Sequence, residues 1–145
     1  MRVRHERPNL TRLTRLGFVN AYLVAEDDGL TLVDTMLSGS ADRILGAAEG
    51  LGRPIARVVL THAHSDHAGS LDALAERLPG VEVAVSERES RLLAGDHGLD
   101  PGEPDSPLRG GWPKVETRPI ASRPSQAALY GWPMTRPLER PQAPF

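Results

Sequence analysis

The feature that most constrains this chain is a histidine-rich block directly after an apolar run. Residues 55–60 (IARVVL) are short and nearly continuous in apolar character, which is typical of a strand buried on both faces. Residues 61–70 (THAHSDHAGS) follow and place three of the five histidines and one aspartate within six residues. The leucines after the block recur at helical spacing. A buried strand that ends in such a loop and continues into a helix predicts an α/β unit with a site at the end of the strand.

The residue types in this block suit a divalent metal ion. His62 and His64 stand two apart on an extended segment, so their side chains project to the same side and can close on one cation. Asp66 and His67 lie at the following turn and can face a second cation. Zinc accepts imidazole and carboxylate ligands, and an open position on it would hold a water molecule whose pKa falls to about 7. The chain has no cysteine, which leaves His, Asp and Glu as its only strong metal ligands.

Ordinary structural roles are the alternative for these residues. A polar loop can simply cap the next helix through bonds to its backbone, but three imidazoles are unnecessary for that purpose. The isolated His5 and His97 are expected to be surface or hydrogen-bonded residues. Asp34 ends a predicted strand before a turn, which is consistent either with a turn cap or with a place in the site. The sequence therefore favours a metal-binding loop and leaves the role of Asp34 open.

Two antiparallel strands are predicted ahead of this unit. Residues 19–26 and 30–33 are rich in apolar and β-branched residues, and Asp28-Gly29 between them is a hairpin turn signal. A helix with Ser40 as its cap is predicted to follow, because apolar residues recur there at helical spacing. These elements lead into the buried strand of residues 55–60.

The pattern continues beyond the histidine block. A helix is predicted over residues 71–78, and a strand over residues 81–85, where apolar residues alternate. Ser86 and Glu89 then form a capping-box pair for a third helix. The order strand, strand, helix, strand, helix, strand, helix predicts an α/β fold, layered in the α+β manner, with helices packed on a sheet.

The C-terminal part of the chain has a different composition. Residues 118–145 contain six of the thirteen prolines, and no strand or helix pattern there exceeds a few residues. We therefore divide the chain of 145 residues into a core, residues 1–117, and an irregular tail, residues 118–145, outside that core.

Charge and hydropathy exclude several classes of partner. The formal net charge is −2, which provides no electrostatic reason to expect binding to nucleic acid or to an anionic membrane. The longest apolar runs are only a few residues, so no membrane-spanning segment is expected. The first residues (MRVRHERPNL) lack the apolar region of a signal peptide, which favours a cytoplasmic protein.

The histidine block and the elements around it resemble those of the metallo-β-lactamase-fold hydrolases. The resemblance covers about residues 17–117 and depends on LVDT at residues 32–35, on THAHSDHAGS and on the order of elements. It implies an αββα sandwich of two similar halves, of which this chain supplies the first half. It also implies that a metal-bound hydroxide attacks an ester, thioester, lactone, amide or phosphodiester.

The resemblance also implies a role for each site residue. His62 and His64 correspond to ligands of a first metal ion, and Asp66 and His67 to ligands of a second, so that one or two zinc ions are expected. Asp66 is also the residue expected to act in catalysis. Asp34 resembles a buried aspartate that orients the loop. Redox di-iron relatives carry glutamate in place of His64, so hydrolysis is favoured over electron transfer.

The sequence departs from the family in its second half. The family completes each metal site with later ligands, including a third histidine in a Gly-His-x-x-Gly-His-like turn, and this chain has no histidine after His97. His97 itself comes too soon to be the third ligand. A truncation or frameshift near residue 118, one piece of a split protein, and an inactive metal-binding remnant are the three explanations. The change in composition favours the first explanation. A half-sandwich would also expose an apolar face, through which self-association is expected.

The expected function is therefore that of a zinc-dependent hydrolase acting on a small ester, thioester, lactone or amide, in a truncated or frameshifted form. The alternative is a catalytically inactive metal-binding remnant or one piece of a split protein. A nuclease of the same fold is disfavoured, because the sequence lacks a basic surface run and stacking aromatic residues.

Overall fold

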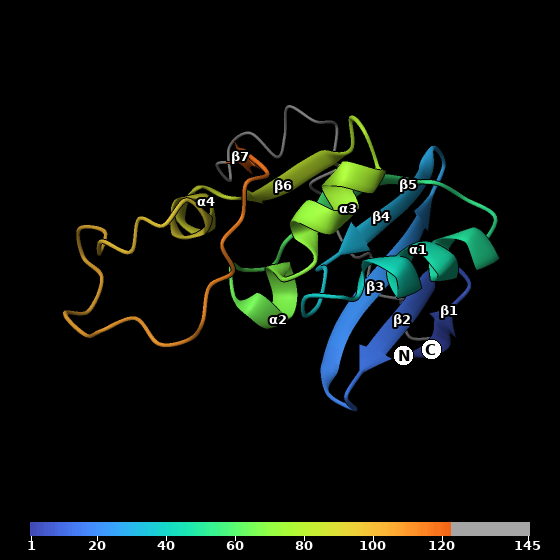
Figure 1. The fold of residues 1–145 in the computed structure, drawn as a ribbon, viewed down its shortest axis with the longest axis horizontal. Helices are drawn as coiled ribbons and strands as arrows, with labels where there is room; N and C mark the ends of the chain where they lie inside the picture. The colour runs from blue at the N-terminus through green and yellow to red at the C-terminus, as the bar shows by residue number, and fades with distance from the viewer. Residues whose placement is uncertain (123–145) are drawn as a thin grey trace, which may run out of the picture.

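The computed structural model describes residues 1–122, and residues 123–145 lie outside the described part. Seven strands form one mixed sheet in the order β1-β2-β3-β4-β5-β6-β7 (Figure 1). The strands are β1 (Arg2–Arg7), β2 (Leu10–Arg15), β3 (Val19–Glu26), β4 (Gly29–Val33), β5 (Ile55–Val59), β6 (Glu82–Ser86) and β7 (Ile120–Ser122). The helices are α1 (Ala41–Gly50), α2 (Ser65–Ala68), α3 (Leu71–Arg77) and α4 (Glu87–Leu93). The predicted α/β class is confirmed.

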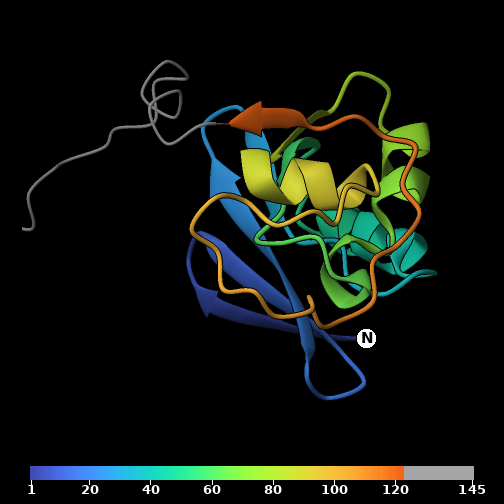
Figure 2. The same ribbon diagram turned by 90° about the vertical axis from the view of Figure 1, so that its left-hand side faces the viewer.

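The sheet divides into an antiparallel half and a parallel half. Strands β1 to β4 pair antiparallel through short connections. Strands β4 to β7 pair parallel, because a connection through α1, α3 or α4 lies between successive strands. The carboxyl ends of β4, β5 and β6 therefore meet at one edge of the sheet. Figure 2 shows how the segment after α4 returns past α3 to reach β7.

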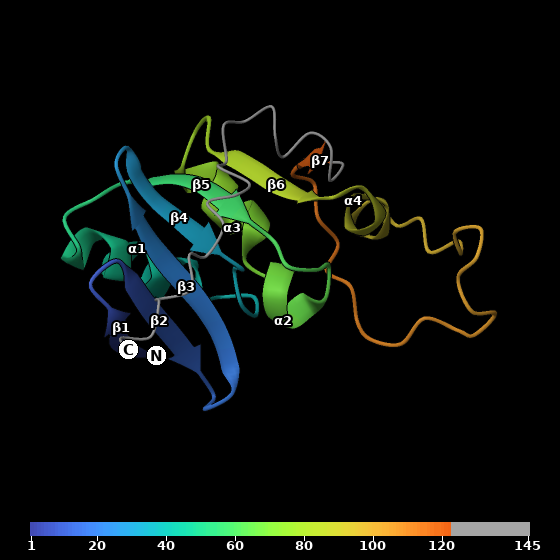
Figure 3. The ribbon, with the colours of Figure 1, turned by 180° about the vertical axis from the view of Figure 1, so that it is seen from behind.

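One face of the sheet forms the core with the helices. Helices α1 and α3 cover that face, as the opposite views of Figures 1 and 3 show. Strand residues Leu23, Leu32 and Val58, which are neighbours in register, have exposed fractions of 1% or less. They join the buried Ile44 of α1 and Leu74 of α3 in one hydrophobic cluster. The alternation of apolar residues along the strands thus buries one complete face.

The opposite face of the sheet carries a row of half-buried apolar side chains. Tyr22, Val33, Val59 and Ala84 are neighbours in register across four strands, and each is of intermediate exposure. Ile120 of β7 extends this row and is 45% exposed. Self-association through this face stays a prediction.

The N-terminal strands were absent from the sequence prediction, which began the sheet at residue 19. Strand β1 has the sequence RVRHER and is exposed along its whole length, so its residues carry no hydrophobic alternation. In β2, only Thr11 and Leu13 are buried. Charged side chains are typical of edge strands. Because the prediction depended on the pattern of apolar residues, it missed this hairpin.

Two predicted local features differ in detail from the structure. The turn between β3 and β4 consists of Asp27 and Asp28, because Glu26 and Gly29 already pair. Ser40 is the N-cap residue of α1, but its hydroxyl donates to the carbonyl oxygen of Leu37 and does not cap the helix. The Ser86 half of the predicted capping box of α4 is confirmed, since the Ser86 hydroxyl accepts a hydrogen bond from the backbone N–H of Glu89.

The C-terminal boundary stays a prediction. Strand β7 begins three residues beyond residue 117 and pairs with β6, which places a short element of the predicted tail on the sheet. Within residues 1–122, no helix has both the length and the apolar composition that a membrane crossing requires.

Candidate metal centre

The histidine block lies where the parallel strands end. Strand β4 ends one residue before Asp34, β5 ends at Val59, and β6 leads into α4. The backbone N–H of Asp34 donates to the carbonyl oxygen of Val59 at 2.9 Å, and the N–H of Leu60 donates to Ala84 at 2.9 Å. Three chain segments are thereby joined at the carboxyl edge of the sheet, which is where α/β sheets form their sites.

Asp34 bonds to two residues of the block. Its side chain is 6% exposed, and its backbone has a φ of +62°, a left-handed conformation that aspartate tolerates better than most residues. Oδ1 accepts a hydrogen bond from the backbone N–H of Thr61 at 2.8 Å. The Thr61 hydroxyl lies 2.8 Å from Oδ2, and Nδ1 of His67 lies 2.8 Å from the same oxygen. The carboxylate therefore joins the end of β4 to Thr61 and to His67 of the block.

His62, Asp66 and His67 form a group that could hold a metal ion. Each offers one ligand atom, and these atoms lie within 4.8 Å of one another. The rings of His62 and His67 are 3.9 Å apart between centroids, and Nε2 of His67 is 3.4 Å from Oδ2 of Asp66. Because Nδ1 of His67 donates a hydrogen bond to Asp34, the neutral ring has its lone pair on Nε2, where a metal requires it. Two imidazoles and a carboxylate are a donor set that fits zinc.

His64 lies beside this group without belonging to it. Its ring centroid is 4.8 Å from that of His62, in an edge-on arrangement. Its Nε2 is hydrogen-bonded to the carbonyl oxygen of Arg109 at 3.1 Å. The sequence predicted His62 with His64 and Asp66 with His67, whereas the structure brings His62 together with Asp66 and His67.

The electrostatic environment favours the neutral form of His62. Partial burial lowers the pKa of His62, and the neighbouring His67 and His64 lower it further. Asp34 and Glu89 act in the opposite direction without reversing the shift. A neutral imidazole is the form that binds a metal ion, so the environment keeps His62 ready for ligation.

Glu89 supports the block from α4, a role that the sequence analysis did not predict. Its carboxylate oxygen Oε2 accepts a hydrogen bond from the backbone N–H of Ala63 at 2.7 Å. The capping-box pattern had assigned Glu89 only to the start of α4. Its position one turn after the end of β6 is the signal that could have placed it near the site.

A second support comes from the chain after α4. The backbone N–H and the hydroxyl of Ser65 both donate to the carbonyl oxygen of Gly111, each at 2.8 Å. The Trp112 ring lies 5.6 Å from the ring of His64 and 4.6 Å from the ring of His97, measured between centroids. His97 thus packs on Trp112 and is not part of the metal-binding group in residues 1–122.

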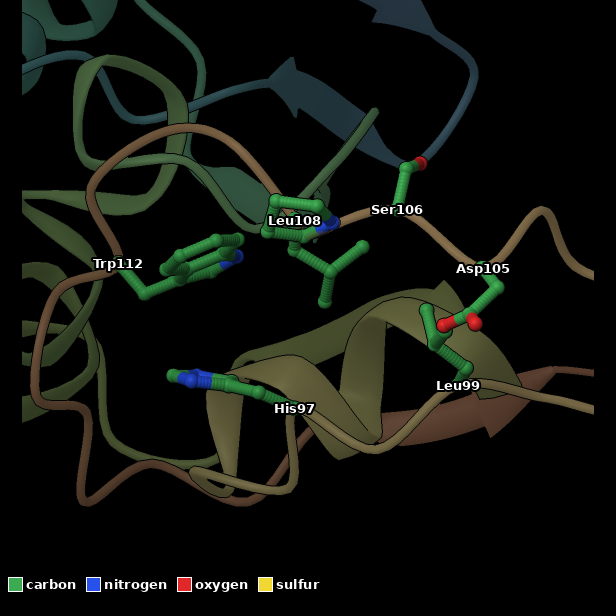
Figure 4. Close-up of a pocket in the computed structure, with 7 residues that line it drawn as sticks. His97, Leu99, Asp105, Ser106, Leu108 and Trp112 are labelled. Carbon is green, nitrogen blue, oxygen red and sulfur yellow. The ribbon is translucent and has the colours of Figure 1, made fainter.

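A hollow of about 280 Å³ lies beyond Trp112. Figure 4 shows His97 and Trp112 at one end, Asp105 at the other and Leu108 between them. Trp112 lines this hollow and its ring lies 5.6 Å from the ring of His64, between centroids, so the hollow is close to the candidate metal centre.

Comparison with known proteins identifies the family. Residues 14–138 match the family model described as the metallo-beta-lactamase superfamily. This chain belongs to the metallo-beta-lactamase superfamily. The resemblance inferred from LVDT and THAHSDHAGS is thereby confirmed.

Individual members of the superfamily are similar over part of their length. The chain is 48% identical over 111 residues to the uncharacterized protein YobT of Bacillus subtilis (strain 168), a match that covers 76% of this chain and 48% of that protein. It is 33% identical over 94 residues to hydroxyacylglutathione hydrolase of Stenotrophomonas maltophilia (strain R551-3), covering 65% of this chain and 35% of that protein. The metallo-β-lactamase MIM-1 from Novosphingobium pentaromativorans matches with a TM-score of 0.62 and 26% identity, over 82% of this chain and 44% of that structure.

The chain therefore spans about half or less of the length of these relatives. The metallo-hydrolases among the relatives support a general hydrolase function for the superfamily. The superfamily generally binds metal ions, and the group of His62, Asp66 and His67 is consistent with that property.

Proposed function

We propose that this protein is a zinc-dependent hydrolase acting on a small ester, thioester, lactone or amide. The observation that carries the proposal is the group of His62, Asp66 and His67, whose ligand atoms lie within 4.8 Å of one another. His64, next to this group, would provide a further imidazole. One or two ions could be held in this way, and the chemistry of the donors favours zinc.

Zinc bound here would supply Lewis acidity, which polarises a carbonyl group and lowers the pKa of a water molecule. The protein's own contribution is to hold the donors in place. Asp34 accepts a hydrogen bond from the Nδ1–H of His67 and so orients the ring with Nε2 toward Asp66. The side chain of Asp66 is 46% exposed. Besides holding the metal ion, we assign its carboxylate the role of accepting a hydrogen bond from water or substrate with the oxygen that does not face the ion.

The hollow beyond Trp112 is the proposed place for part of the substrate. Its volume of about 280 Å³ is enough for a small acyl or aromatic group. Leu99 and Leu108 line it and are 40% and 36% exposed, respectively, so apolar surface is available there. A small-molecule substrate is therefore proposed, with its apolar part in the hollow and its carbonyl group toward His64.

Metal binding without turnover is the second candidate function. The described residues form a single three-residue group that could hold a metal, and catalysis requires a cation held in fixed geometry with an open position. A protein that binds zinc at this group and hydrolyses nothing would act as a metal-binding unit or as one piece of a split protein.

The test combines zinc binding with a hydrolysis assay. The chelator-treated protein is titrated with zinc by calorimetry at pH 7.5 and then assayed with thioester, ester, lactone and amide substrates. His62→Ala is the site variant and His5→Ala, on β1, is the matched control. If the wild-type protein takes up zinc and hydrolyses a substrate, and both properties disappear in His62→Ala, the hydrolase is supported. Zinc uptake by the wild-type protein without hydrolysis supports the second candidate. Absence of zinc uptake in the wild-type protein would refute both.

A further inference from the structure

We propose that residues Arg109–Trp112, here called the 109–112 segment, position His64 as a zinc ligand through its Nδ1 atom. This inference rests on the proposed metal site and assigns a role to a part of the chain that carries none of the family's sequence motifs. The segment lies more than forty residues from His64 in sequence and reaches it only in the folded protein.

The hydrogen bond to Arg109 determines the proton on His64. A backbone carbonyl oxygen can only accept a hydrogen bond, so Nε2 of His64 must carry the hydrogen in the 3.1 Å contact with Arg109. A neutral imidazole with hydrogen on Nε2 has its lone pair on Nδ1 alone. While this bond is made, Nδ1 is therefore the nitrogen of His64 that can bind zinc.

Two further hydrogen bonds hold the segment against the block. The backbone N–H and the hydroxyl of Ser65 converge on the carbonyl oxygen of Gly111, and each bond is 2.8 Å long. These bonds fix the segment at the residue next to His64, so movement of the segment would also displace the Arg109 carbonyl group.

Gly110 shows that the imidazole ring is seated directly on the backbone of the segment. A Cβ atom at Gly110 would lie 2.3 Å from Nε2 of His64 and 2.7 Å from its Cδ2, which is too close for any side chain. The φ of Gly110 is +126°, a conformation that residues with a side chain rarely adopt. Trp112 adds a ring contact to His64 on the same segment.

This arrangement couples zinc binding to the position of the segment. If the segment stabilises the zinc-binding form of His64, then zinc must stabilise the docked segment by the same free energy. The Arg109–Gly110 peptide bond is a trypsin site in an exposed part of the segment. Zinc is therefore expected to slow cleavage at this bond.

The experiment compares two glycine variants of the full chain. Gly110→Ala places a methyl group against His64, whereas Gly102→Ala changes a residue of the same loop with a similar φ of +92° and nothing within 4 Å of its Cβ position. Zinc affinity is measured by calorimetry on both variants and on the wild-type protein. We expect Gly110→Ala to weaken zinc binding about 10–100-fold, as for other residues that orient a metal ligand, and Gly102→Ala to leave it unchanged.

Two readouts separate positioning from a general structural role. The ¹⁵N NMR signals of the His64 side chain in the metal-free protein should show hydrogen on Nε2, and Gly110→Ala should remove that preference. In a His64→Ala background, Gly110→Ala should cause no further loss of zinc affinity.

The outcomes distinguish this inference from the proposed function. If the wild-type protein binds zinc and Gly110→Ala binds it equally or more tightly, the positioning role is refuted and the proposed metal site is retained. Hydrogen on Nδ1 of His64 in the metal-free protein would refute the positioning role as well. Absence of zinc binding by every variant would refute the metal site itself.

Discussion

At the scale of single residues, the candidate metal centre is held by side chains that belong to other elements. Asp34 at the end of β4 binds Thr61 and His67, and Glu89 of α4 accepts from the backbone of Ala63. The spacing of the histidines predicted that His62 and His67 belong to a site, because local spacing decides which residues share a loop. It did not reveal Glu89 as a support, because that contact joins two segments that are distant in sequence.

A substitution at Asp34 tests whether its carboxylate positions His67. Asp34→Asn keeps the shape of the side chain but replaces one acceptor oxygen with an NH₂ group, so the side chain can no longer accept hydrogen bonds from both the Thr61 backbone N–H and the Nδ1–H of His67. We expect zinc affinity to fall about 10–100-fold, measured by calorimetry at pH 7.5. Asp27→Asn, an exposed aspartate in the β3–β4 turn, is the control and should bind like the wild-type protein. Equal affinity in Asp34→Asn would show that Asp34 acts only in the turn.

The lowered pKa of His62 predicts a pH dependence of stability. Because burial and the neighbouring imidazoles lower its pKa below the ordinary value of 6.5, the unfolded chain binds this proton more readily than the folded chain. The contribution of His62 to the free energy of unfolding is therefore complete above about pH 6.5. It is lost as the pH falls from there toward the lower pKa of the folded state.

Urea unfolding of the chelator-treated protein at pH 7.5 and pH 5.5 measures this effect. His62→Gln should lose less stability between the two pH values than the wild-type protein. His5→Gln, in the exposed strand β1, serves as the control for a histidine outside the site. An equal loss in His62→Gln and in the wild-type protein would contradict the prediction.

At the scale of elements, the loop after β4 packs on the backbone of α2. The backbone N–H of Thr35 donates to the carbonyl oxygen of His67, and Met36 forms a bridge with Ala68. Gly69 permits this approach, since a Cβ atom there would lie 2.6 Å from the backbone nitrogen of Ser38 and 2.9 Å from the carbonyl oxygen of Met36, both in the loop after β4. The sequence predicted the strand before α2 and the helix after it from apolar periodicity. It could not predict that the loop after β4 would cross α2.

Two glycine substitutions test this packing. Gly69→Ala should lower the free energy of unfolding by about 1–3 kcal/mol, because its methyl group meets backbone atoms that cannot move aside. Gly46→Ala lies in α1 with nothing within 4 Å of its Cβ position, and it should raise the free energy of unfolding by about 1 kcal/mol. Urea unfolding measures both values. A neutral effect of Gly69→Ala would mean that the two segments are not closely packed.

In the molecule as a whole, α3 binds the segment that runs from α4 back to β7 at the edge of the sheet. Asp72 of α3 accepts hydrogen bonds from the backbone N–H groups of Glu116 and Thr117, at 2.9 and 2.8 Å, and from the Thr117 hydroxyl at 2.6 Å. Strand β7 then pairs with β6 at the edge of the sheet (Figure 2). Helix α3 thus holds the chain at residues 116 and 117, just before β7, and the core boundary at residue 117 stays a prediction.

Two truncated chains test the division of the molecule. A chain that ends at Ser122 keeps β7 and the contacts of Asp72, and its melting temperature should be close to that of the full chain. A chain that ends at Thr117 loses the pairing of β7 with β6, which is worth about 0.5–1.5 kcal/mol for each hydrogen bond, and should unfold at a lower temperature. A melting temperature lowered by many degrees in the chain that ends at Ser122 would show that residues 123–145 contribute to the core.

Residue spacing was enough to predict the local features: the buried strand β5, the hairpin of β3 and β4, the helices α1, α3 and α4, and the histidine block. Each of these follows from the spacing of neighbouring residues, which expresses the geometry of a strand or a helix directly. The contacts of Asp34 with His67, of Glu89 with Ala63 and of Arg109 with His64 could not be predicted in this way and are seen first in the folded chain. Those contacts depend on which strand ends lie side by side in the sheet, and strand order is set by packing of the whole core.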